Sequence, residues 1–426
     1  MMRGGERHAR RALSSHSHAP APPHRQRAQT LSDAPLRVIR IEQVTLREIR
    51  LPLVTPFRTT AGVVAERRIL LLELTDGDGI AAWSECVAEA LPSYSPDTVD
   101  TCWLAISEWL APRVLGRAFA SPQEADPVLA RDVRGHRMAR AAVEMGVWAL
   151  DAARRGRPLA ASLVDASAYA RERSAAPRAY VETGVALGMS ASPDALVEGA
   201  RAALAAGYPR IKMKVEPGSD VAFVGAVRAA LGPGAALSVD ANGSYTLDES
   251  GHVRALDALD ALGLVMIEQP LAAGDLVRHA ELQRRLATRL CLDESVGDLH
   301  DAESMLTLGS ARVVNIKPGR VGGLREAVAI HDRCARAGVP VWCGGMLECG
   351  IGRAYNVALA SLPGFTEPGD LSPSAHYWTR DVVAPEWTMD AHGRVRVPLD
   401  RPGLGVDVDV GRVDDLTVRS ATLRAR

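Results

Sequence analysis

Short apolar segments alternate with longer segments of helical periodicity from about residue 181 onward. The apolar segments predict eight strands, near 181–186, 210–213, 236–239, 264–267, 289–292, 312–316, 339–343 and 363–366. Seven segments between them, such as 192–206 and 322–337, are long enough for helices. Charged groups end five consecutive strands at intervals of 24 to 28 residues, the length of one strand, one helix and two loops. This pattern predicts an α/β fold, a (β/α)7β modified TIM barrel.

The N-terminal part has a different pattern, with strands first and helices after them. Two apolar runs flank the Asp-Gly-Asp-Gly turn at 76–79, and the polar segment 56–62 (PFRTTAG) reads as a loop before them. Strands and helices in separate runs indicate an α+β domain, which the tail after residue 382 is expected to complete. We therefore expect a disordered tail at 1–36, a capping domain at 37–165, the barrel at 178–381, and a C-terminal segment at 382–426 that returns to the cap.

Composition and charge favour a small-molecule partner. The formal net charge is −1 and no long block of like charge occurs in the body of the chain, so we expect no nucleic-acid or membrane partner. The six cysteines form no CxxC pair and read as buried thiols of a cytoplasmic protein. No apolar run approaches the roughly 20 residues that span a bilayer.

Three acidic residues end successive predicted strands: Asp240, Glu268 and Asp293. The carboxyl ends of barrel strands meet at one mouth, so these side chains are expected to lie together there. Three hard oxygen ligands suit Mg²⁺ or Mn²⁺, and no histidine or cysteine stands at a spacing that favours zinc. Any one of these acids alone would more often be a helix N-cap or a solvated loop residue; three in register predict a metal site.

Lysines stand on both sides of these acids. Lys212 and Lys214 are two apart on one strand and share a face, and Lys317 ends a strand across the ring. Burying two ammonium groups is costly unless they are paired, and mutual repulsion beside a metal would lower the pKa of Lys214. Such a set suits removal of a proton next to a carboxylate, with the metal stabilising the enediolate.

At these residues the sequence resembles the enolase superfamily, and within it the o-succinylbenzoate synthase / N-acylamino acid racemase family. The resemblance covers about residues 38–410, with IKMKVEPG, VDAN, IEQPL, CLDES and VNIKPGRVGG among its most specific motifs. It implies that Asp240, Glu268 and Asp293 bind Mg²⁺. It also implies that Lys214 and Lys317 are the acid/base pair and that Lys212 tunes Lys214 and contacts the substrate carboxylate, with Asn242 as its polar neighbour. We also expect a homo-oligomer.

The same resemblance implies a substrate pocket between the cap and the barrel. Phe57 and Tyr94 match the lid of the family, although alone they would read as ordinary packing residues. Gly345, Met346 and Tyr377 match the barrel side of the pocket. Without the resemblance, Tyr377 would also read as an ordinary packing residue. Two positions depart from the family pattern: Glu89 stands where relatives usually have an apolar residue, and Ala186 where a small polar one is common.

The resemblance implies two reactions for one site. The first is Mg²⁺-dependent syn-dehydration of 2-succinyl-6-hydroxy-2,4-cyclohexadiene-1-carboxylate to o-succinylbenzoate, a carbon–oxygen lyase step of menaquinone biosynthesis. The second is racemisation of N-acylamino acids, such as N-succinylamino acids, by proton exchange between Lys214 and Lys317. Arg320, three residues after Lys317, is typical of the branch that contains racemases; it could lower the pKa of Lys317, or it could pair on the surface. Muconate cycloisomerase activity and a non-catalytic carboxylate-binding barrel are further alternatives.

Overall fold

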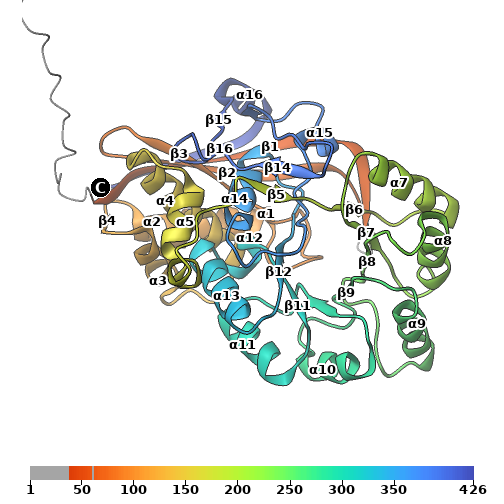
Figure 1. Cartoon of the computed structure of the whole chain (residues 1–426). Helices are drawn as coiled ribbons and strands as arrows, with labels where there is room; N and C mark the ends of the chain where they lie inside the picture. Colours follow the sequence, from red (N-terminus) through yellow and green to blue (C-terminus); the bar gives the residue numbers. More distant parts are fainter. Residues whose placement is uncertain (1–37, 60–61) are drawn as a thin grey trace, which may run out of the picture. The chain divides into compact units, whose positions relative to one another are not determined.

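A curled parallel sheet forms the centre of the protein (Figure 1). The computed structural model describes residues 38–59 and 62–426. Seven strands pair in the order β12-β11-β10-β9-β8-β7-β6, every pair parallel. They are β6 (Val185–Leu187), β7 (Ile211–Lys214), β8 (Leu237–Asp240), β9 (Met266–Glu268), β10 (Leu290–Leu292), β11 (Val313–Ile316) and β12 (Val341–Cys343). The predicted modified TIM barrel is confirmed.

Helices follow the strands and cover the outside of the sheet (Figure 1). α7 shows why these segments are helical: Ser192 caps its first turn, Pro193 begins it, and Leu196, Ala200 and Ala203 place one buried stripe toward the strands. Asp220, Asp275 and Asp298 cap three of the later helices with their side chains, whereas the other four have no side-chain cap. The set comprises α7 (Pro193–Ala205), α8 (Val221–Leu231), α9 (Ser250–Asp260), α10 (Leu276–Arg285), α11 (Leu299–Leu308), α12 (Pro318–Val321), α13 (Leu324–Arg336) and α14 (Gly350–Ala360).

The predicted eighth strand at 363–366 is wrong as a regular strand. Residues 365–370 instead close the barrel through isolated parallel bridges, Val341 with Phe365 and Thr183 with Gly369. The Asp370 amide donates to the Cys343 carbonyl at 2.9 Å. The segment contains prolines and glycines, and a proline cannot donate to a ladder, so continuous pairing fails. The first predicted strand also divides: β5 (Tyr180–Glu182) pairs antiparallel with β14 (Arg394–Arg396), outside the barrel.

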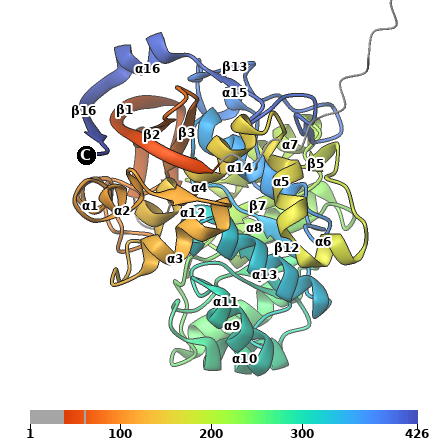
Figure 2. The same ribbon diagram turned by 90° about the vertical axis from the view of Figure 1, so that its left-hand side faces the viewer.

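An antiparallel sheet precedes the barrel in sequence and includes the end of the chain (Figure 2). Its order is β16-β1-β2-β3, with β1 (Ile39–Thr59), β2 (Gly62–Asp76), β3 (Ala81–Cys86) and β16 (Thr417–Arg424), while β4 (Ala118–Phe119) pairs with β1. The loop expected at 56–62 is wrong in part. Phe57 pairs with Val64 and Arg58 with Val63, so this segment is a long arm of the β1–β2 hairpin. A register shift between Pro52 and Phe57 interrupts the ladder at its base.

One helix, α4 (Arg137–Arg154), connects this sheet to the barrel. The helix is buried on nearly every side from Met138 to Ala152. A Cβ at Gly146 would meet Leu74 Cδ1 of β2 at 2.6 Å, so a larger residue would force this buried leucine side chain to move. Smaller helices complete this part and the tail: α1 (Val99–Ala105), η1 (Ile106–Leu110), α2 (Ala111–Val114), η2 (Pro122–Glu124), α3 (Ala125–Ala130), α5 (Leu159–Ala166), α6 (Ala168–Glu172), α15 (Ser374–Tyr377) and α16 (Val410–Leu416).

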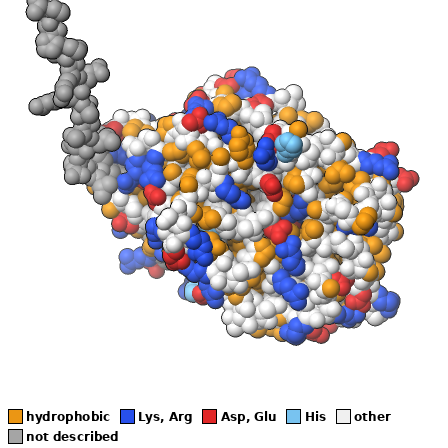
Figure 3. Space-filling view, in the orientation of Figure 1, with side chains coloured by type: hydrophobic (Ala, Val, Ile, Leu, Met, Phe, Trp, Pro, Cys, Tyr) orange, Lys and Arg blue, Asp and Glu red, His pale blue; other side chains and the backbone are white. Residues whose placement is uncertain are grey.

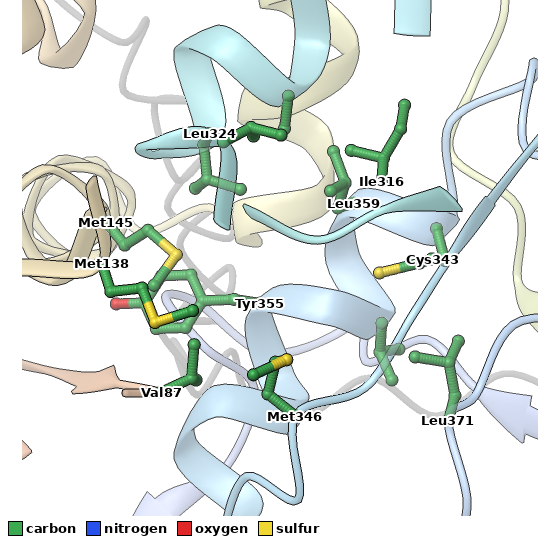
Figure 4. Close-up of a cluster of buried hydrophobic side chains, with 14 of the residues drawn as sticks. Val87, Met138, Met145, Ile316, Leu324, Cys343, Met346, Tyr355, Leu359 and Leu371 are labelled. Atoms are coloured by element: carbon green, nitrogen blue, oxygen red, sulfur yellow. The ribbon is translucent and has the colours of Figure 1, made fainter. Parts of the chain in front are cut away.

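Apolar and polar contacts join the N-terminal elements to the barrel (Figure 4). Val87, Met138 and Met145 lie on the side of Tyr355 that faces the N-terminal elements. The Tyr355 hydroxyl donates to the Trp83 carbonyl at 2.6 Å. Val38–Arg426 forms one compact unit, and the internal boundaries at 165, 178 and 381 stay a prediction. The predicted tail at 1–36 lies outside the described residues.

Charges of both signs are mixed over the molecular face in Figure 3, as the near-zero net charge suggests. All six cysteines are buried and free, as expected. No helix within residues 38–59 and 62–426 combines the length and the apolar content needed to span a bilayer.

Buried Glu85 at the end of β3 should make stability depend on pH. Its carboxyl accepts hydrogen bonds from the Cys349 thiol and the Gly352 amide, both at 3.0 Å. Burial raises the pKa of Glu85 from 4.5 to about 8, so the native state holds this proton more tightly than the unfolded chain. The contribution of this proton to the free energy of unfolding is complete below pH 4.5. Above that pH it falls by roughly 1.4 kcal/mol per pH unit and is lost by about pH 8.

We therefore expect the free energy of unfolding of Glu85→Gln to fall less steeply with pH between 5 and 8 than that of the unchanged protein. Chemical denaturation at several pH values measures both slopes. Equal slopes would show that the native carboxyl does not carry this proton.

Candidate active site

A cavity of about 490 Å³ opens at the carboxyl ends of the barrel strands. The hairpin arm of β1–β2 and the segment around Tyr94 form its outer wall, and the strand ends form its floor. The predicted pocket residues line it together, although they come from distant parts of the chain: Phe57, Tyr94, Lys212, Lys214, Asp240, Asn242, Lys317, Gly345, Met346 and Tyr377. Glu268, Asp293 and Arg320 lie behind this lining and are almost fully buried.

The few lysines of the chain all lie at this site. Lys212, Lys214 and Lys317 are the only lysines among 426 residues, and every other strongly basic side chain is arginine. All three line the cavity. A guanidinium stays protonated at any pH at which proteins function, whereas an ammonium group in a suitable environment can lose its proton. All lysines of the chain thus lie in one cavity, where an ammonium group could take up or release a proton.

β7 places two of these lysines against carboxylates. Lys214 Nζ lies 2.7 Å from Asp240 Oδ2 and donates to Asn242 Oδ1 at 2.5 Å. Lys212 Nζ lies deeper, 3.0 Å from Glu268 Oε2 and 3.4 Å from Asp240 Oδ2. Burial alone would raise the pKa of Asp240, but Lys214 and Lys212 hold it below its usual range. The costly burial of like charges is thus offset by ion pairs.

β10 and β11 form the opposite side. Lys317 Nζ donates to Asp293 Oδ2 at 2.8 Å and lies 4.4 Å from the centre of the Tyr94 ring. The Tyr94 hydroxyl donates to Asp293 Oδ1 at 2.9 Å, so the lid residue contacts the floor directly. Arg320 also pairs with Asp293 and donates to the Asn315 and Val296 carbonyls. The surface alternative for Arg320 is therefore wrong.

The pKa of Lys317 differs from the expected direction. Burial lowers the pKa of its ammonium group, but Tyr94 and the nearby carboxylates outweigh burial and raise it. Arg320 shares Asp293 with Lys317, and its own pKa is lowered by burial. The net pKa of Lys317 is therefore raised in this arrangement of charges, and the contribution expected from Arg320 stays a prediction. A divalent cation on the same carboxylates would oppose their effect and favour the neutral amine.

The three predicted metal ligands end adjacent strands, but they pair with lysines here. Within residues 38–59 and 62–426, no three acidic, histidine or cysteine side chains form a preorganised metal cluster. Glu268 nevertheless fits a ligand role, because its Oε2 is fully buried and is approached by the Lys212 ammonium group at 3.0 Å without a hydrogen bond from any other described group. Asn315 Nδ2 holds the other oxygen, Oε1, at 2.8 Å. Three carboxylates on neighbouring strand ends remain the donor set that Mg²⁺ prefers.

Two further acids belong to the site and were not assigned from the sequence. Asp370, from the segment that closes the barrel, pairs with Lys212 at 2.7 Å and with Arg210 at 2.8 Å. Glu294 accepts from Asn242 Nδ2 at 2.8 Å, and its pKa is raised by burial and by the charge of Asp240. The only sequence signals were the PGD motif at 368–370 and the second acid of CLDES.

These features define the class of the protein: a capped (β/α)7β barrel with paired lysines and carboxylates at the mouth. Two family models match it, the mandelate racemase / muconate lactonizing enzyme N-terminal domain at residues 40–163 and the enolase C-terminal domain-like model at 195–412. The chain belongs to the enolase superfamily.

Several relatives match most of this chain. It is 45% identical to an o-succinylbenzoate synthase of Geobacillus kaustophilus over 89% of this chain and 96% of that protein. It is 42% identical to an N-succinylamino acid racemase of Amycolatopsis over 89% and 98%. A solved enolase superfamily structure from Listeria innocua superposes with a TM-score of 0.83 at 34% identity, covering 91% of this chain and all of that one.

Proposed function

We propose that this protein is an o-succinylbenzoate synthase, a carbon–oxygen lyase that dehydrates 2-succinyl-6-hydroxy-2,4-cyclohexadiene-1-carboxylate. The observation that carries the proposal is the placement of all three lysines, each paired with a carboxylate, in one cavity. Relatives 36–45% identical over most of the chain are o-succinylbenzoate synthases, which agrees with this assignment. The substrate is accordingly a small carboxylate.

The chain's own groups can carry out the proton transfers. Lys214 takes the proton next to the substrate carboxylate and returns it to the departing hydroxyl on the same face. Lys212 places a positive charge beside the substrate carboxylate, with Asn242 as a polar neighbour. Lys317 presents its ammonium group from the opposite side and stabilises the developing negative charge. Phe57, Met346 and Tyr377 shape the pocket, and Tyr94 covers Lys317 and excludes water.

We assign Asp240, Glu268 and Asp293 as the ligands of a divalent cation. Enolase superfamily members generally use Mg²⁺. The buried Glu268 Oε2, which lies 3.0 Å from the Lys212 ammonium group and accepts no hydrogen bond, supports this assignment. When bound, such a cation supplies positive charge that makes the proton next to the substrate carboxylate more acidic. Arg320 keeps Asp293 oriented through the ion pair described above.

Replacing Asp240 by asparagine should weaken Mg²⁺ binding about tenfold or more, because one anionic oxygen becomes a neutral amide. Isothermal titration calorimetry with MgCl₂ measures this without any substrate. Asp220→Asn is the matched control, since Asp220 is a buried acid of the same half of the barrel that caps α8 and does not line the cavity. Equal Mg²⁺ affinity of Asp240→Asn and the unchanged protein would contradict the ligand assignment.

Racemisation of N-acylamino acids is the second candidate. The arrangement that favours it is an amine on each side of the acids, Lys214 from β7 and Lys317 after β11, with buried Arg320 beside Lys317's partner Asp293. Relatives at 42% identity are N-succinylamino acid racemases. Parallel steady-state kinetics with the cyclohexadiene carboxylate and with N-succinylamino acids distinguish the two reactions. Lack of turnover with both would reject the proposed function.

The number of subunits is a further part of the proposal. We propose a homo-oligomer, as the sequence comparison with the family suggested. Size-exclusion chromatography with light scattering measures the mass directly. A monomer at micromolar concentration would reject this part and leave the chemistry untouched.

A further inference from the structure

The outer wall of the cavity has a different character from its floor. The floor carries the lysines and their carboxylate partners, whereas the outer wall contributes apolar side chains, among them Phe57, Val63, Val64 and Leu91. Glu89 interrupts this apolar wall. It lies on the segment that also carries Tyr94, so it borders the same space as the reacting groups.

Four charged side chains line the outer wall, Glu66, Arg67, Arg68 and Glu89. Arg67 forms no ion pair among the described residues and donates to the Val87 and Ala88 carbonyls. Glu66 pairs with Arg50 at 3.0 Å, and Arg68 pairs with Glu48 and Asp100. Glu89 has no ion-pair partner among the described residues; Ser93 Oγ donates to its Oε2 at 2.8 Å. Its side chain is half-buried. A carboxylate therefore faces the cavity without a cation in ion-pair contact, since the Arg67 guanidinium is held on the Val87 and Ala88 carbonyls.

The side chain of Glu89 is not needed to hold its own segment. The backbone does this, because the Val99 amide donates to the Glu89 carbonyl at 2.9 Å and Glu89 bridges to Thr98. The serine that contacts the carboxylate is exposed and close in sequence, and such a local hydrogen bond is readily exchanged for a stronger partner. Glu89 is thus available to a ligand in the cavity.

We propose that Glu89 is a specificity residue that selects N-acylamino acids with a cationic side chain, such as those of lysine or arginine. This inference rests on the proposed function, in its racemase branch. A substrate held at the floor by its α-carboxylate directs its side chain or its acyl group toward the outer wall. An ammonium or guanidinium group there would pair with Glu89, whereas an apolar side chain would strip water from the carboxylate and leave it unpaired.

The test compares Nα-acetyl-lysine with Nα-acetyl-norleucine, which has nearly the same shape but no charge. Racemisation is followed by polarimetry with Mg²⁺ present. We expect kcat/KM to favour the lysine derivative by roughly threefold to tenfold, mainly through KM, since the contact is remote from the reacting carbon. Glu89→Gln should remove the preference, and added salt should weaken it in the unchanged protein.

Glu66→Gln is the matched control, because Glu66 also lines the cavity but is neutralised by Arg50; its preference should equal that of the unchanged protein. Thermal unfolding checks that Glu89→Gln is folded. A preference that survives in Glu89→Gln, or an unchanged protein that prefers norleucine, overturns the inference. Synthase turnover without any racemisation overturns it too and leaves the synthase proposal standing, whereas absence of both activities rejects the proposed function itself.

Discussion

Lys214→Ala should lose both synthase and racemase turnover, by roughly 10²- to 10⁴-fold in kcat, because no other group occupies its position at the end of β7. In deuterated water the variant should also stop exchange of the α-proton in the enantiomer whose proton faces Lys214. Proton NMR of an N-succinylamino acid measures exchange and inversion in the same sample. Loss of exchange shows that the proton-abstraction step itself has failed.

The low lysine content gives this experiment a direct control. Protein labelled with ¹⁵N-lysine contains three labelled side chains, so the spectrum of Lys214→Ala should lack one signal and keep those of Lys212 and Lys317. Retained spectra for these two show that the ion pairs of the floor survive the substitution. α-Proton exchange in that same enantiomer at the rate of the unchanged protein would remove Lys214 from the mechanism.

Lys317→Ala should abolish racemisation by a similar factor but leave a one-sided exchange. Lys214 can still take and return a proton on its own face, so one enantiomer of the substrate should exchange its α-proton without inversion. The other enantiomer should be inert, because its proton faces the missing amine. NMR for exchange and polarimetry for inversion separate these two outcomes.

Buried Arg320 provides a comparison for this variant. It pairs with the same carboxylate, Asp293, but its guanidinium stays protonated and cannot act as a base at neutral pH. Arg320→Lys should therefore keep exchange on both faces, at a reduced rate. Equal exchange of both enantiomers by Lys317→Ala would contradict the two-lysine geometry.

Much of the fold could be predicted because strand and helix periodicities repeat along the chain. The strands from β7 to β12 lie within or close to the predicted apolar runs. The failures share one cause: backbone pairing that side-chain pattern does not report. The 363–366 run contains a proline and a glycine and forms only isolated bridges, and the polar 56–62 segment is held in a hairpin arm by pairing of Phe57 with Val64.

The candidate site also has features that the sequence shows and features that it does not. Lysines and acids at strand ends are visible in a sequence once the barrel repeat is recognised. Asp370 and Glu89 were not assigned roles, since their function depends on neighbours far apart in the chain, such as Lys212 across the closed barrel. The pairing of each lysine with a carboxylate, and hence the direction of the pKa shifts, also depends on distances of a few ångströms that sequence spacing does not contain.

The sequence by itself determined the barrel repeat, the residue types at the strand ends and the restriction of lysine to three positions. These follow from local periodicity and composition, which each segment carries alone. Only the tertiary structure decided which acid pairs with which amine, that Arg320 is buried against Asp293, and that Glu89 lines the cavity without an ion-pair partner among the described residues. Such features arise from the closure of the barrel and the position of the hairpin arm over it, and electrostatic energies at short range depend on that geometry.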